Sequence, residues 1–413
     1  MGKVNSGGII VVMVVVSILA LVFLTGQSRE QTPEESVFTI GVFSHSVYNL
    51  SYIQTAELAR AMINNYCEEN DAPYFFEFIY NYTDHSPSAV DITDSFHNQG
   101  IDIIIGYGRS SMINFADKFA QQLGVVMVSP SGENIYPGLY PHIFTLGPTV
   151  STEARAATWL VRDFNITRLV VFKKYSFSGI SPFLDGFIES TEQEIIVETV
   201  PYAVSNDYTI DPKYIEDLEV AVTKSSQIGE TGILFVGDVG LYEVMKAATW
   251  SNKLSSVCWF ANYEAYFSKE HIPDLSPDTV LVGDNEVKVY LLRDAPLNNS
   301  KYNRLNGLFE ETYNDSDSCF QPYLYDSLWV TALTLMEVGS TYNETVIAEF
   351  PAIASDYEGV TGRCQLDEYN QRYSSDYDII CYSFKDSALL LDWLGTVDSD
   401  ELIIWFKKSI LPE

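Results

Sequence analysis

Short apolar runs alternate with amphipathic stretches through the first third of the chain. The apolar runs predict buried strands at residues 38–43, 74–80, 101–105 and 125–128. Between them, apolar residues recur at helical spacing and predict helices at residues 53–65, 89–99 and 111–123. This alternation, with nearly continuous apolar strands, is typical of a parallel sheet covered by helices on both faces.

The same alternation repeats further along. Strands are predicted at residues 168–172, 194–199, 232–236 and 256–260, and helices at 151–164, 182–191, 215–225 and 241–250. Two α/β lobes of similar size are therefore expected. Proteins built in this way usually hold a ligand between the lobes, outside the carboxyl ends of the strands.

Two loops that follow predicted strands carry hydroxyl groups. GYGRSS (residues 106–111) directly precedes a predicted helix, and SPSGE (residues 129–133) follows the next strand. Serines and free backbone N–H groups at a helix start form either an ordinary N-cap or a seat for a carboxylate or other anion. The loop sequence alone leaves both interpretations open.

The N-terminus carries an uncharged apolar run from Ile9 to Leu24, with Lys3 before it. Its length lies between a signal-peptide core and a minimal membrane span. We expect an N-terminal apolar helix that anchors the protein and places the remainder outside the membrane. Cleavage after Gly26, giving a secreted protein, is the alternative. Six N-x-[ST] sequons support an outside location and a glycoprotein, at Asn49, Asn81, Asn165, Asn298, Asn314 and Asn343.

Charge and composition narrow the function classes. The 413 residues include 56 acidic and 24 basic side chains, a net charge of −32, which repels phosphate backbones. We therefore expect no nucleic-acid partner. The five histidines show no metal-ligand spacing, and the chain has no GxSxG elbow. We expect no metal, no cofactor and no enzymatic activity.

Six segments together resemble a known family. They are FTIGVF (38–43), IDIIIGYGRSS (101–111), GVVMVSPSGENI (124–135), HIFTLGPT (142–149), QPYLYDSLWVTALTLMEVG (321–339) and GVTGRCQLDEYNQR (359–372). In order and spacing, residues 38–384 resemble the type I periplasmic-binding fold, particularly the leucine/isoleucine/valine-binding proteins and related receptor ectodomains.

The resemblance implies two doubly wound parallel-sheet lobes joined by a three-strand hinge, after the N-terminal apolar helix. The expected division is residues 1–26 for the signal peptide or anchor and 27–36 for a tether. Lobe 1 then takes residues 37–147 and 286–376, lobe 2 takes 148–285 and 377–395, and residues 396–413 form a C-terminal helix.

The resemblance also implies reversible capture of a small solute by closure of the hinge. In amino-acid-binding relatives the first lobe holds the ligand carboxylate and the second holds its ammonium group. The matching positions in lobe 1 are Ser110 or Ser111, and Ser131 with Glu133. Arg109 and Ser129 of the same two loops are further candidates, and Tyr48 in the first loop could cover the cleft. The candidates in lobe 2 are Tyr175, Asp238 and Glu264.

Glu133 departs from the family pattern, because relatives place a carboxylate-binding Thr two residues after Ser131. A carboxylate facing a carboxylate is unfavourable unless one is protonated or paired. Arg109 either pairs with Glu133 or contacts the ligand itself, and both residues could equally lie in solvent. A cationic, polyol, amide-like or modified ligand is therefore as compatible as a branched-chain amino acid.

Cys364 and Cys381 flank the late hairpin that the resemblance implies, and we expect them to form a disulfide. Three functions remain open. The first is the solute-binding component of an ABC-type importer, which delivers its ligand to a membrane permease. The others are a sensing ectodomain with a separate signalling partner, and a surface glycoprotein that kept the fold without a ligand.

Overall fold

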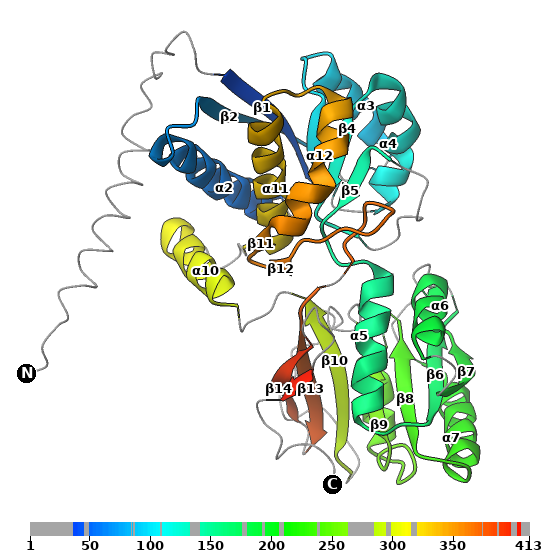
Figure 1. Ribbon diagram of the computed structural model, residues 1–413. Helices are drawn as coiled ribbons and strands as arrows, with labels where there is room; N and C mark the ends of the chain where they lie inside the picture. Colours follow the sequence, from blue (N-terminus) through cyan, green and yellow to red (C-terminus); the bar gives the residue numbers. More distant parts are fainter. Residues whose placement is uncertain are drawn as a thin grey trace, which may run out of the picture.

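The computed structural model describes residues 36–44, 49–83, 85, 87–107, 110–132, 141–175, 180–191, 195–205, 210–237, 240–262, 285–294, 299–314, 320–373, 375–385, 388–397 and 403–405. These residues form two α/β lobes, one above the other in Figure 1. Each lobe has a central sheet with helices on both faces, as the alternation of elements predicts.

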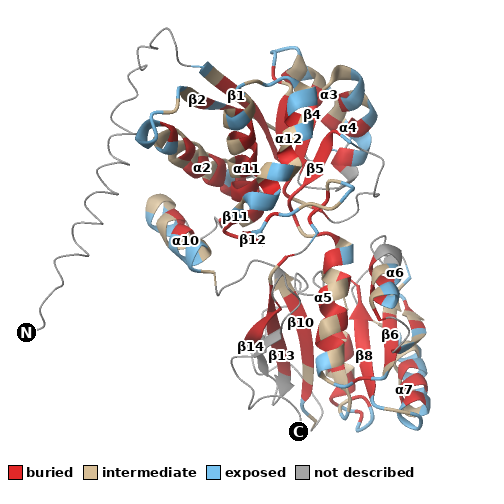
Figure 2. Cartoon of the chain, viewed as in Figure 1, coloured by how far each residue is buried: buried red, intermediate tan, exposed pale blue. Residues whose placement is uncertain are grey.

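Lobe 1 contains a five-stranded parallel sheet of order β2-β1-β3-β4-β5. The strands are β1 (Ser36–Ser44), β2 (Tyr74–Tyr82), β3 (Ile103–Gly106), β4 (Val126–Ser129) and β5 (Ile143–Thr145). One face packs on α2 (Asn49–Glu69), α11 (Pro322–Val338) and α12 (Asn343–Asp356), and α10 (Ser300–Tyr313) packs on α2. The other face packs on α3 (Ser88–His97) and α4 (Ser110–Leu123). Strands buried on both faces explain the continuous apolar runs in the sequence (Figure 2).

Lobe 2 contains an eight-stranded mixed sheet of order β15-β14-β13-β10-β9-β8-β6-β7. The parallel strands are β6 (Arg168–Lys174), β7 (Ile196–Tyr202), β8 (Thr231–Val236), β9 (Cys258–Ala261) and β10 (Val287–Asp294). The antiparallel extension is β13 (Tyr377–Lys385), β14 (Ala388–Val397) and β15 (Ile403–Trp405). Helices α5 (Val150–Asp163) and α6 (Ile180–Ser190) cover one face, and α7 (Pro212–Ser226) and α8 (Leu241–Ala248) cover the other.

The chain passes between the lobes three times. It leaves lobe 1 between β5 and α5, returns between β10 and α10, and leaves again between the short hairpin β11 (Glu358–Gly359)–β12 (Gly362–Arg363) and β13. These three crossings lie where the family resemblance implies a hinge, and the region around them is called the hinge below.

Two elements differ from the expected division. Strand β10 was expected in lobe 1 as part of residues 286–376, but it pairs with β9 and β13 in the lobe 2 sheet. Residues 396–413 were expected to form a helix, but β15 is a strand on the free edge of β14. Since β14 offers unpaired backbone groups along that edge, a short apolar segment can satisfy them as a strand.

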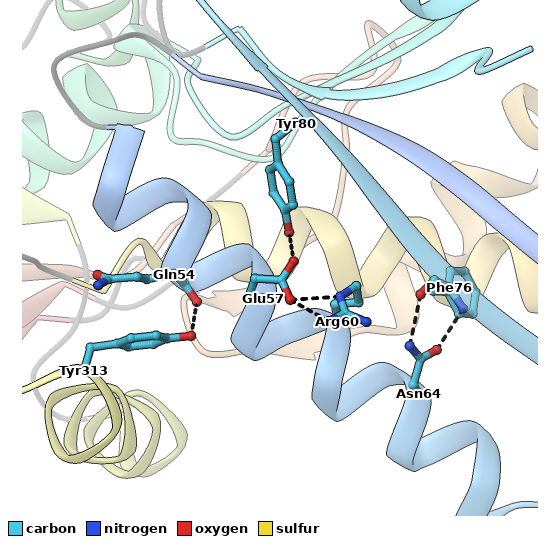
Figure 3. A network of polar contacts seen from close by, with 7 residues as sticks. All are labelled: Gln54, Glu57, Arg60, Asn64, Phe76, Tyr80 and Tyr313. Atoms are coloured by element: carbon cyan, nitrogen blue, oxygen red, sulfur yellow. Dashed lines mark hydrogen bonds and ion pairs between the residues drawn. The ribbon is translucent and has the colours of Figure 1, made fainter. Parts of the chain in front are cut away.

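The edge strand β2 is covered by helix α2 (Figure 3). The side-chain amide of Asn64 donates to the carbonyl oxygen of Phe76 at 3.0 Å, and the N–H of Phe76 donates to Asn64 Oδ1 at 2.8 Å. Further along β2, the hydroxyl of Tyr80 donates to the carboxylate of Glu57 at 2.5 Å. Glu57 also forms an ion pair with Arg60. Tyr313 of α10 donates to the carbonyl oxygen of Gln54 at 2.9 Å, which fastens α10 to lobe 1.

The expected N-terminal apolar helix lies outside the described residues. Within the described ranges, no helix combines the length and the hydropathy needed to cross a bilayer.

Candidate functional site

The carboxyl ends of the parallel strands in both sheets lie at the hinge. In lobe 1, β5 ends at Thr145, whose carbonyl oxygen accepts a hydrogen bond from the N–H of Arg372 in the third crossing. In lobe 2, β10 ends at Asp294, opposite the first residue of β13, Tyr377. Because the other parallel strands run in the same direction as β5 or β10, the carboxyl ends of both sets of strands point toward the crossings between the lobes (Figure 1).

The loop after β3 turns sharply against the end of β1. Gly106 has φ +138°, and a Cβ at this position would lie 1.8 Å from the carbonyl oxygen of Phe43, so only glycine fits. Tyr107 is fully buried, and its hydroxyl lies 2.7 Å from the Thr93 hydroxyl. These two residues anchor the loop, and helix α4 begins at Ser110 directly beyond it.

The loop after β4 is shaped by its own serines. Ser129 is buried, and its hydroxyl donates to the carbonyl oxygen of Ser131 at 2.6 Å while accepting from the N–H of Ser131 at 3.1 Å. A Cβ on Gly147 would lie 2.2 Å from the carbonyl oxygen of Pro130. The loop is therefore packed directly against the first hinge crossing, and Gly132 pairs there with Thr149.

In lobe 2, the ends of β8 and β9 are joined by Asn262. This side chain is buried, and its Oδ1 accepts from the N–H of Gly237 at 3.0 Å, while its backbone N–H donates to the carbonyl oxygen of Phe235. A Cβ on Gly237 would lie 2.2 Å from the Tyr202 hydroxyl. This packing fixes the start of the loops that carry Asp238 and Glu264.

Tyr175 directly follows β6 and is 68% exposed. Its N–H donates to the carbonyl oxygen of Tyr202 at 2.8 Å. Ser110 and Ser111 form the first turn of α4, at the hinge end of lobe 1. The other expected contacts, Tyr48, Arg109, Glu133, Asp238 and Glu264, lie outside the described residues.

A buried network of polar side chains lies at the hinge end of lobe 1. Asp326 of α11 accepts from the N–H groups of Val360 and Thr361, both at 2.9 Å, and from the Thr361 hydroxyl at 2.5 Å. Burial raises the pKa of Asp326, and these donors oppose that effect. The guanidinium of Arg372 donates to the Thr361 hydroxyl and to the carbonyl oxygens of Leu146, Thr361 and Arg363. Residues of the first and third crossings are thereby held together.

The expected Cys364–Cys381 disulfide is wrong. Both thiols are free and buried, and they belong to the cores of different lobes. Cys364 follows β12 in lobe 1, whereas Cys381 lies within β13 opposite Tyr290. The two cysteines are separated because the chain crosses to lobe 2 before β13, which pairs with β10 and β14 and not with the late hairpin. Burial raises the pKa of each thiol to about 12.

Sequence reasoning missed Tyr107, Asn262 and Arg372, which position the candidate site without belonging to its expected contacts. The signal for Tyr107 was local, because a large aromatic residue between two glycines indicates a buried anchor after a tight turn. Arg372 could have been found because a basic residue at the end of the late hairpin was already part of the resemblance.

Solved structures share this fold. The branched-chain amino acid transporter substrate-binding protein LivJ of Streptococcus pneumoniae, in complex with isoleucine, is 15% identical, with a TM-score of 0.57 over 87% of this chain and 99% of that one. An ABC transporter substrate-binding protein of Desulfitobacterium hafniense, complexed with Leu, is 18% identical, with a TM-score of 0.61 over 86% and 100%. An ABC transporter solute-binding protein of R. palustris, in complex with benzoate, is 14% identical, with a TM-score of 0.53 over 89% and 99%.

No curated protein sequence matches this chain. These structures confirm the type I periplasmic-binding fold. The sequence pattern described as "Receptor family ligand binding region" matches residues 54–384, most of the chain. The chain therefore belongs to this receptor ligand-binding family, whose members are binding proteins and not enzymes.

Proposed function

We propose that this protein is an extracytoplasmic solute-binding protein, which captures a small polar, amino-acid-like ligand between its two lobes and delivers it to the permease of an ABC-type importer. The observation that carries the proposal is the arrangement of the strand ends. The carboxyl ends of β3 and β4 in lobe 1 and of β6, β8 and β9 in lobe 2 point toward the three crossings that join the lobes. Membership of a ligand-binding family supports it.

The ligand contacts that we propose are those that the family resemblance implies. Lobe 1 contributes Tyr48, Arg109, Ser110, Ser111, Ser131 and Glu133, and lobe 2 contributes Tyr175, Asp238 and Glu264. Ser129 acts indirectly, since its hydroxyl is engaged within its own loop. The start of α4 provides N–H groups and a positive dipole end for an anionic group of the ligand.

The location is part of the proposal. The apolar run from Ile9 to Leu24 anchors the chain, or directs its secretion if cleaved, and residues 27–36 serve as a tether. Solute capture outside the membrane is consistent with similar structures whose names identify them as ABC transporter substrate-binding proteins.

A thermal-shift screen of the full chain tests the proposal. The panel contains amino acids, amides, polyamines, betaines, sugars, nucleosides and benzoate, each at millimolar concentration. A ligand at about 100 times its dissociation constant adds roughly 2.7 kcal/mol to the free energy of unfolding, an upward shift of a few degrees. A hit confined to one chemical class supports capture. No shift across the panel contradicts the proposal and favours a surface protein without a small ligand.

A further inference from the structure

A groove lies on the outer layer of lobe 2, between helices α7 and α8. Its volume is about 410 Å³. It is lined by Ile210, Pro212, Ile215, Glu216, Glu219, Glu243, Lys246, Ala247, Trp250 and Ser251. None of these residues belongs to the proposed ligand site at the hinge.

The lining has the spacing of two facing helix stripes. On α7 it comes from positions 212, 215, 216 and 219, and at α8 from positions 243, 246, 247 and 250. Both sets follow i, i+3, i+4, i+7, and the second continues from α8 into the turn that carries Trp250, so each side of the groove presents one stripe. Two such stripes offer the seat into which a third helix can pack with its apolar side chains.

The floor of the groove is apolar, and an exposed aromatic side chain lies at one end of it. Ile210, Ile215 and Ala247 are half-buried, which leaves apolar surface available to an incoming side chain. Trp250 is 66% exposed at the end of the α8 stripe. An exposed Trp beside an apolar floor is typical of an anchor residue in a protein–protein interface.

The rim of the groove is acidic. Three carboxylates, Glu216, Glu219 and Glu243, face one ammonium group, that of Lys246. In the part of the chain that the structure describes, no ion pair neutralises any of the three carboxylates. The chain as a whole has a net charge of −32, which adds to the negative potential.

We propose that this groove binds a basic amphipathic helix of another protein. The apolar side chains of the helix would pack on Ile215, Ala247 and Trp250, and its Lys or Arg side chains would pair with the carboxylates of the rim. This recognition differs from solute capture at the hinge, so the groove keeps its partner whether or not lobe closure occurs.

The test measures binding of a labelled synthetic helix by fluorescence anisotropy. The probe has about 18 residues, five helical turns, with leucines at i, i+3, i+4, i+7 and lysines elsewhere. One control peptide has the same composition in scrambled order, and another carries glutamates in place of the lysines. Against the full chain, we expect saturable binding of the probe and at least tenfold weaker binding of both controls.

Matched variants locate the binding. Trp250→Ala and the triple variant Glu216→Gln/Glu219→Gln/Glu243→Gln should each weaken binding about tenfold. Val220→Ala, also exposed on α7 but outside the groove, and Glu311→Gln/Glu337→Gln/Glu349→Gln in lobe 1 should change the dissociation constant less than twofold. No saturable binding, or equal losses in the groove and lobe 1 variants, would overturn the proposal.

Discussion

Arg372 donates a hydrogen bond of 3.0 Å to the carbonyl oxygen of Leu146 and so links the third hinge crossing to the first. The same guanidinium holds the Thr361 hydroxyl at 2.7 Å, and Thr361 in turn donates to Asp326. All three side chains are fully buried. The two crossings are therefore tied to the core of lobe 1 and not only to each other.

Replacement of Arg372 should destabilise the fold strongly. Arg372→Met leaves the Leu146, Thr361 and Arg363 carbonyl groups without their donor and the buried Asp326 without its nearby cation. We expect a loss of about 3–5 kcal/mol in the free energy of unfolding, measured by urea denaturation. Arg372→Lys keeps the charge but lacks the fork of donors, so it should be intermediate. A Met variant as stable as the parent would show that the network is not structural.

Asn64 should protect the edge of β2. Asn64→Ala removes both hydrogen bonds to the backbone of Phe76, and we expect a cost of about 1–3 kcal/mol together with increased aggregation. Asn65→Ala is the matched control, because Asn65 lies next to it on α2 and its side-chain amide donates to the exposed Glu69 at 2.9 Å. Thermal unfolding and light scattering measure the two effects. Equal behaviour of the two variants contradicts the protective role.

Gly147→Ala should disturb the loop of Ser129 and Ser131. The added Cβ would lie 2.2 Å from the carbonyl oxygen of Pro130, so the loop must move away from the first crossing. We expect a cost of about 1–3 kcal/mol and weaker binding of any ligand found by the screen. Gly307→Ala is the control, since a Cβ there meets nothing within 4 Å and helix α10 accepts alanine readily. Unchanged ligand affinity in Gly147→Ala would place the ligand elsewhere.

A buried acid–base pair makes the stability of lobe 1 depend on pH. Burial raises the pKa of Asp117 to about 6 and lowers the pKa of His142, whose Nε2 lies 3.5 Å from Asp117 Oδ1. With its pKa raised above the unfolded value, the ionised Asp117 costs stability above about pH 6, and the cost disappears as the pH falls toward 4. His142 acts oppositely, because its protonation costs stability as the pH falls below 6.5.

Asp117→Asn separates the two contributions. The variant should be more stable than the parent by about 1–3 kcal/mol at neutral pH and should lose this advantage near pH 4. Urea denaturation across this range measures the difference. Glu311→Gln, an exposed carboxylate of the same lobe, should show no such dependence. A constant difference between Asp117→Asn and the parent at all pH values would contradict the burial effect.

Most of the fold could be predicted because its strands are buried on both faces. Nearly continuous apolar runs in the sequence correspond to the buried strands β1, β3, β4, β6, β8 and β9. Such runs are stable only when they are buried in a core, so their position could be predicted. Helices α10 and α12 were not predicted. Helix α10 buries only Leu305 and Phe309, so its apolar stripe is faint, and α12 contains Pro351, which normally ends a helix.

The candidate site was predictable only in part. The loops could be placed, since they follow strands whose direction is fixed by the parallel sheets. The residues of a strand do not determine which sheet it joins, because that depends on its pairing with distant strands. For this reason the predicted lobe of β10 and the predicted disulfide partner of Cys381 were wrong. The packing of Tyr107 and Asn262 depends on contacts between distant segments, which no local pattern contains.

The distance between the lobes tests the central claim most directly. Spin labels at cysteines substituted for Phe115 of α4 and Ile188 of α6, both exposed, report this distance in the full chain by pulsed electron paramagnetic resonance. The native thiols described by the structure are buried or half-buried, and labelling the parent alone measures their background. With a ligand from the screen, we predict a shorter distance in the parent and no change after Ser110→Ala/Ser131→Ala. An identical distance distribution with and without the bound ligand would contradict capture by hinge closure.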